Sequence, residues 1–141
     1  SQSGMFVTVY YLILHPNGRV IGVNAGHNRP LLFRTAQNTS EVLPRGGRAL
    51  GWFDPLPLET IERRLNPGDV LVLYTDGLTE AENLHGEPYG ETRLVETVHR
   101  AAGLPAAEIL KRINTSVASF MGAAPPFDDT TLLILRYTGH R

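Results

Sequence analysis

The sequence has no cysteine, no excess of basic residues and no long apolar run. Without cysteine there is no disulfide, thiolate metal site or cysteine nucleophile, so any bound metal must have oxygen or histidine ligands. The 13 basic residues are balanced by 14 acidic ones, which leaves no basic field for nucleic acid or an anionic membrane. No segment approaches the roughly 18 apolar residues of a transmembrane helix, and no signal peptide opens the chain. We therefore expect a cytoplasmic protein that binds neither nucleic acid nor membranes.

Several signatures of catalysis are also missing from the sequence. There is no Walker-type phosphate loop, no Gly-x-Ser-x-Gly elbow and no dinucleotide fingerprint. The five histidines share no spacing typical of zinc ligands. The acidic residues are therefore the better candidates for chemistry.

The 141 residues fit one domain that can bury about 70% of its unfolded surface. Strands come first, then two helices, then a last strand, which indicates an α+β fold with a mostly antiparallel sheet. The turn signal Pro16-Asn17-Gly18 predicts a tight two-residue hairpin. We expect strands over residues 5–15, 19–24, 31–34, 60–65, 70–74 and 130–137, with a short apolar step at 42–43, and helices over 91–102 and from 105 to about 121.

The first candidate residue is Asp76, which follows the apolar strand 70–74 and precedes Gly77. A carboxylate at the end of a buried strand needs a cation, hydrogen-bond donors or solvent beside it. Gly77 would let the backbone approach a bound group closely. The alternative is that Asp76 only caps a short helical turn over residues 78–82.

The second candidate is the pair Asp128 and Asp129, which precedes the last strand. Adjacent residues of an extended chain face opposite ways, so only one of the two can readily point at a given ion. Taken alone, the pair is typical of a solvated loop. Together with Asp76 it would suit Mg²⁺ or Mn²⁺, which prefer oxygen ligands and keep part of their water shell.

Other polar residues carry weaker signals. His27, three residues after Asn24, could donate a proton or bind an oxyanion, but it also fits a polar turn. Arg45 and Arg48 lie in a glycine-rich segment and could bind a phosphate or simply solvate a loop.

Five stretches, in this order and at natural spacing, resemble the later part of a SpoIIE-type phosphatase domain, the bacterial branch of the metal-dependent phosphatases related to protein phosphatase 2C. The resemblance covers nearly the whole chain. The stretches are Met5-Phe-Val-Thr-Val-Tyr-Tyr, Asn24-Ala-Gly-His-Asn, Gly47-Arg-Ala-Leu-Gly, Pro67-Gly-Asp-Val-Leu-Val-Leu-Tyr-Thr-Asp-Gly-Leu-Thr-Glu-Ala and Phe127-Asp-Asp-Thr-Thr.

The resemblance implies a β-sandwich flanked by helices with a two-metal Mn²⁺ or Mg²⁺ site that hydrolyses phosphoserine or phosphothreonine on a partner protein. The metal aspartates of the family match Asp76 and Asp128, and Asp129 matches a neighbouring polar position with a supporting role. The remaining matches to family motifs, without an assigned duty, are Gly77, Asn24 and His27. The substrate implied is a phosphorylated regulator of the anti-sigma-factor antagonist type.

Family members also take metal ligands from segments that precede the point where this chain begins. The chain starts at Ser1 without methionine and is inside an apolar run by Met5, so we expect residues 1–141 to be the C-terminal portion of a single phosphatase domain, inactive alone. A shortened relative that serves as a non-catalytic binding module is the alternative. Uncovered strand faces predict pairing with another segment or a second copy, as in a homodimer. Partner choice is expected on loops 44–56 and 83–89.

Overall fold

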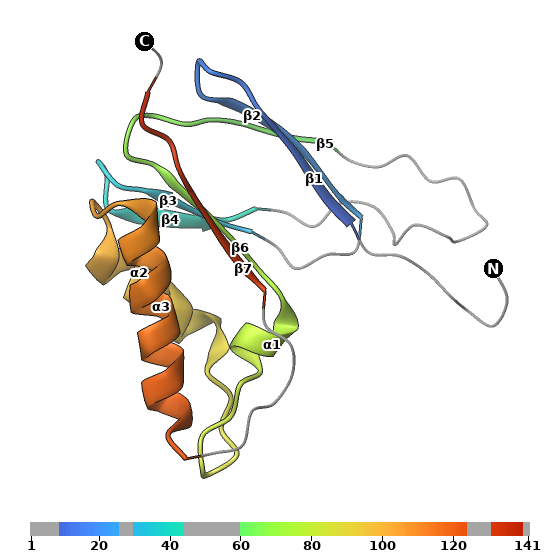
Figure 1. Ribbon diagram of the computed structural model, residues 1–141. Helices are drawn as coiled ribbons and strands as arrows, with labels where there is room; N and C mark the ends of the chain where they lie inside the picture. Colours follow the sequence, from blue (N-terminus) through green and yellow to red (C-terminus); the bar gives the residue numbers. More distant parts are fainter. Residues whose placement is uncertain (1–8, 26–29, 44–59, 124–130, 140–141) are drawn as a thin grey trace, which may run out of the picture.

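The computed structural model describes residues 9–25, 30–43, 60–123 and 131–139 of the chain. This part forms two antiparallel sheets and three helices (Figure 1). The elements are β1 (Val9–Leu14), β2 (Arg19–Ala25), β3 (Leu31–Arg34), β4 (Thr39–Val42), β5 (Thr60–Arg64), β6 (Val70–Tyr74), α1 (Asp76–Thr79), α2 (Gly90–Ala101), α3 (Ala106–Met121) and β7 (Leu132–Arg136).

The first sheet has the strand order β1-β2-β5, and the second has the order β4-β3-β6-β7. All neighbouring strands run antiparallel, which confirms the fold class predicted from the order of the elements. β6 lies inside the second sheet, where Tyr74, its last residue, is paired with Leu132, the first residue of β7. The chain positions that follow β6 and precede β7 are therefore neighbours in space.

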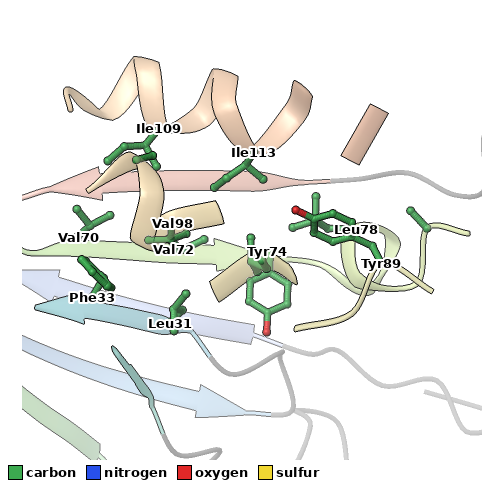
Figure 2. Close-up of a cluster of buried hydrophobic side chains, with 13 residues drawn as sticks. Leu31, Phe33, Val70, Val72, Tyr74, Leu78, Tyr89, Val98, Ile109 and Ile113 are labelled. Carbon is green, nitrogen blue, oxygen red and sulfur yellow. The ribbon is translucent and has the colours of Figure 1, made fainter. Parts of the chain in front are cut away.

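The four-stranded sheet is apolar on both faces because it lies between two other layers. Leu31 and Phe33 face α2 and α3, whereas Leu32 between them packs toward the three-stranded sheet with Val20 and Leu71. Such alternation is what a pleated strand requires when both of its faces are buried. The result is a sandwich of two sheets with helices on the outer face of the second one (Figures 1 and 2).

The two long helices cover this sheet with the apolar stripes that their sequences predict. Leu94 and Val98 of α2 and Ile109 and Ile113 of α3 are fully buried in one cluster with residues of β3 and β6, as Figure 2 shows for most of them; α2 contacts β3, and α3 contacts β7. α2 is followed by Gly103 at φ +91°, where a left-handed backbone ends the helix readily. In the part of the chain that the structure covers, no helix is both long and apolar enough to span a membrane.

The hairpin between β1 and β2 differs from the predicted two-residue turn. His15 donates its amide to the carbonyl of Arg19 at 2.8 Å, so three residues lie between this pair, and only Gly18 has positive φ. This geometry corresponds to a three-residue hairpin loop with a left-handed last position. A Cβ atom at Gly18 would lie 2.4 Å from the carbonyl oxygen of Leu65. The close approach of the segment that follows β5 therefore also requires glycine at this position.

Most expected elements are present, with shifted ends. The short helix begins at Asp76 rather than at residue 78, and β4 begins at Thr39, before the predicted apolar step. The predictions for residues 5–8, for the motif around His27, for the arginines at 45 and 48, and for the Asp128-Asp129 pair concern residues outside the described ranges.

Candidate functional site

The end of β6 is the place where the sequence predicts chemistry. Tyr74 is buried, Thr75 is the last extended residue with φ −102° and ψ 164°, and Asp76 is the first residue of α1. Leu78 anchors this short helix in the core, with 1% of its surface exposed. In Figure 1, α1 lies at the end of β6, beside the start of β7.

Thr75 joins the end of β6 to the residue that precedes β7. Its amide donates to the carbonyl of Thr131 at 3.1 Å, and its side-chain Oγ1 accepts the amide of Thr131 at 2.9 Å. The hydroxyl thus continues the ladder by one bond at the position where the backbone of β6 turns away into α1. The main chain before Asp76 is consequently held against Thr131, the residue that precedes β7.

The backbone of Asp76 is fixed while its carboxylate is open. Its carbonyl accepts the amide of Glu80 at 2.8 Å, and Thr79 Oγ1 lies 3.5 Å from the same oxygen. The residue is exposed, and its carboxylate oxygens accept no hydrogen bond from any residue that the structure describes. The capping alternative is therefore wrong for these residues, because Asp76 stands after the cap position and its side chain bonds to none of the helix amides.

A second carboxylate, at the other end of β6, has a structural task that the sequence did not indicate. Asp69, just before β6, is 0% exposed and accepts hydrogen bonds from Arg34 Nη1 at 2.9 Å, from the amide of Asn66 at 2.8 Å and from the amide of Thr35 at 3.2 Å. All of its oxygens are occupied within the fold. The two aspartates that flank β6 thus differ: the first one is internal and paired, whereas the second is exposed and open.

The other predicted site residues lie as follows. Gly77 is buried beneath Asp76 in α1, and Asn24 lies in β2, where its backbone pairs with Tyr10. His27, Asp128 and Asp129 lie outside the described ranges, so the convergence of Asp76 and Asp128 stays a prediction.

The described residues at the end of β6 provide only part of the ligands that a hard cation needs. Asp76 offers two free carboxylate oxygens, the ligand type that Mg²⁺ and Mn²⁺ prefer. Among the residues in view, no cluster of three or more histidine or carboxylate side chains could hold a metal ion. Among the described residues, Asp76 could supply one ligand to such a cation, and no described histidine or carboxylate cluster completes a site.

Comparison with solved structures places this architecture among the phosphatase domains related to protein phosphatase 2C. The chain superimposes on the SiaA-PP2C domain of Pseudomonas aeruginosa with a TM-score of 0.73 and 26% identity, covering 86% of this chain and 47% of that one. It also matches the PP2C phosphatase domain of SpoIIE from Bacillus subtilis, solved with a fragment of its regulatory domain, with a TM-score of 0.79 over 100% of this chain and 42% of that one. The latter pair is only 16% identical, so it shows the fold alone.

The sequence comparisons identify the family. The profile of the Stage II sporulation protein E (SpoIIE) family matches residues 1–138, and the chain belongs to this family. It is 30% identical over 131 residues to Protein IcfG of Synechocystis sp., which covers 92% of this chain and 20% of that protein. It is 28% identical over 138 residues to the phosphoserine phosphatase RsbU of Bacillus subtilis, covering 96% of this chain and 40% of RsbU. The chain thus spans two fifths or less of these relatives.

Proposed function

We propose that the protein carrying this chain is a metal-dependent phosphatase that removes phosphate from phosphoserine or phosphothreonine of a regulator protein. The observation that carries the proposal is Asp76, an exposed carboxylate without a partner in the described fold, on a backbone that is fixed on both sides. Membership of the SpoIIE family and similarity to a relative named phosphoserine phosphatase support the reaction class.

Asp76 and Asp128 are the residues that would hold the metal. Asp128 is three residues from Thr131, so its Cα lies at most about 11 Å from that of Thr131, given about 3.8 Å per residue. Since Thr131 is bonded to Thr75, the chain is long enough for Asp128 to return to Asp76. Divalent ions bound there would supply Lewis-acid stabilisation for the charge that develops on the transferred phosphoryl group.

The chain's own residues do the positioning in this scheme. Leu78 in the core and the Thr75–Thr131 bonds fix the backbone on either side of the Asp76 carboxylate, so the ligand needs little reorganisation. Asp129, Asn24 and His27 are proposed as supporting residues around this edge, with Gly77 beneath it. No side-chain nucleophile is required, which agrees with the absence of cysteine and of a serine elbow.

The loop after α1 is our candidate for the choice of substrate. Asn83 Oδ1 accepts the amides of His85 at 2.9 Å and Glu87 at 3.0 Å, which gives the loop a defined shape. At its tip Leu84 is 70% exposed, and the loop ends at the buried Tyr89. A preformed loop with an exposed apolar tip, directly after the helix that carries the site, suits contact with a protein substrate.

The substrate that we propose is a phosphorylated regulator of the anti-sigma-factor antagonist type, acting in the cytoplasm. Pairing of two copies also stays a prediction. Ile13 and Leu133, on strands of different sheets, are 43% and 55% exposed, and size-exclusion chromatography that returned a compact monomer would count against pairing through them.

The test uses the full-length protein that carries this chain. We expect Mn²⁺-dependent release of phosphate from a phosphoprotein or from p-nitrophenyl phosphate, and loss of this activity in Asp76→Asn and Asp128→Asn. The matched control is Glu80→Gln, because Glu80 is an exposed carboxylate one helical turn beyond Asp76. Unchanged activity in Asp76→Asn would reject the site. Absence of metal-dependent turnover in the intact protein would instead favour a binding module.

A further inference from the structure

A groove between α2 and α3 lies apart from the candidate site. It has a volume of about 630 Å³, and both helices line it. None of its residues belongs to α1 or to the strands. The residues that matter for its chemistry are Thr97 and Arg100 of α2 and Lys111, Arg112, Thr115 and Ser116 of α3.

The floor of the groove is tied to the core by hydroxyl groups. The hydroxyl of Tyr89 lies 2.7 Å from Ser116 Oγ and 3.0 Å from Thr97 Oγ1, and Thr97 Oγ1 donates to the carbonyl of Arg93 at 2.8 Å. Tyr89 is 1% exposed and Thr97 is 8% exposed. Buried hydroxyls that satisfy one another fix the side chains that carry them. The spacing of the two helices at the groove is therefore defined rather than adjustable.

The rim of the groove is positively charged, and its cationic side chains have no hydrogen-bond or ion-pair partner among the described residues. Arg100, Lys111 and Arg112 are exposed, and none of them forms a salt bridge or hydrogen bond with another residue of the described ranges. Glu108 is the acidic residue among the described residues of the lining, so their net charge is about +2.

Three arginines elsewhere in the described ranges form ion pairs. Arg19 pairs with Glu62, Arg34 with Asp69, and Arg63 with Glu41. Arg100, Lys111 and Arg112 therefore form a group of cations with no ion-pair partner among the described residues, in a chain whose overall charge is −1. A concave surface lined by one sign of charge raises the local concentration of oppositely charged ligands.

We infer that this groove binds an acidic segment of a partner protein. Carboxylates spaced along a peptide can reach the separate cations of the rim, while the exposed hydroxyl of Thr115 offers a neutral donor beside them. Nucleic acid fits less well, because its affinity depends on many phosphate contacts and three cations provide few. An anionic membrane fits less well because the charges line a hollow rather than a flat or convex face. The inference does not rest on the proposed phosphatase activity.

Fluorescence anisotropy with a fluorescein-labelled oligoglutamate peptide tests the groove. The peptide should bind the protein that carries this chain, and Arg112→Glu should weaken binding about threefold to tenfold, since each tenfold step is 1.4 kcal/mol and exposed charge pairs contribute less than that. Arg64→Glu is the matched control, because Arg64 is also exposed, lies in β5 of the other sheet, and gives the same change in net charge. Circular dichroism melting curves should show both variants folded.

Three results would overturn the inference. The first is an equal loss of affinity in Arg64→Glu, which would mean that only total charge matters. The second is full binding by Arg112→Glu. The third is tighter binding of a single-stranded oligonucleotide of equal charge with the same dependence on Arg112, which would identify a nucleic-acid site. Asp76→Asn should leave peptide binding unchanged, so failure of the groove and failure of the phosphatase proposal can be told apart.

Discussion

Removal of the Asp69 carboxylate should destabilise the protein far more than removal of a surface carboxylate. Asp69 joins the turn before β6 to the end of β3, through one bond to the guanidinium of Arg34 and bonds to the amides of Thr35 and Asn66. In Asp69→Ala the amides of Thr35 and Asn66 lose this acceptor, whereas Arg34 Nη1 keeps its bond to the carbonyl of Arg64. Hydrogen bonds to a charged group contribute about 1.5–3 kcal/mol each, although such contributions are not additive.

The magnitude follows from the burial of the pair. Breaking a buried ion pair by removing one partner costs about 3–5 kcal/mol, because the other charge is left without compensation. The side chain of Arg34 is 22% exposed and also donates to the carbonyl of Arg64, so without Asp69 its guanidinium keeps one protein acceptor and access to water. We therefore expect about 3 kcal/mol for Asp69→Ala and less for Asp69→Asn, whose amide keeps one oxygen acceptor.

The assay is urea unfolding followed by circular dichroism, with the free energy of unfolding taken by linear extrapolation. The matched control is Glu41→Ala, which removes the partner of Arg63 in a pair whose side chains are 41% and 31% exposed. Exposed pairs contribute about 0–1 kcal/mol. A loss in Asp69→Ala no larger than that in Glu41→Ala would refute the reasoning from burial.

Two further predictions concern the site and the surface. In Thr75→Val the amide of Thr131 loses its acceptor, so the free energy of unfolding should fall by about 1 kcal/mol. Calorimetry of the full-length protein should also show weaker Mn²⁺ binding. Thr75→Ser keeps the hydroxyl and should behave as the wild type, and equal effects of the two substitutions would contradict this. The guanidinium of Arg63 lowers the pKa of Glu41 below its ordinary value of 4.5. The stabilisation by this pair is therefore complete above that value and is lost as the pH falls through the lowered pKa. Glu41→Gln should accordingly cost up to about 1 kcal/mol near neutral pH and progressively less as the pH falls below 4.5, and a cost independent of pH would exclude the pair as its source.

Much of the fold could be predicted from local patterns. The continuous apolar run of β6 predicts a strand buried on both faces, and its position between β3 and β7 confirms this. The stripes of α2 and α3 likewise predict the faces that cover the sheet. These features depend on side-chain periodicity, which follows from backbone geometry alone.

The features that the sequence did not reveal depend on contacts between distant segments. The task of Asp69 requires Arg34, which is 35 residues earlier in the chain. The loop at Gly18 is shaped partly by the carbonyl of Leu65, which follows β5 and which the local Asn-Gly signal cannot include. An aspartate after a proline-glycine turn beside a buried strand was a usable signal for a buried acceptor, but its donors could not be named from sequence.

The start of α1 is the clearest case of tertiary contacts deciding a local question. An aspartate suits either the cap or the first turn of a helix, so the sequence alone could not separate a structural Asp76 from a functional one. The ladder of β6 and β7 extends to the bond between Thr75 and Thr131, which keeps Thr75 extended and makes Asp76 the first helical residue.

Neither of the two residues that could cap α1, Thr75 and Asp76, consequently accepts a hydrogen bond from a helix amide with its side chain. The hydroxyl of Thr75 accepts the amide of Thr131, and the carboxylate of Asp76 accepts no bond from the described part of the protein. The junction is held instead by main-chain bonds and by the burial of Leu78. Since the fold does not depend on the Asp76 carboxylate, Asp76→Asn should unfold at the urea concentration of the wild type while metal binding falls. Loss of both together would mean that this residue supports the structure rather than a ligand.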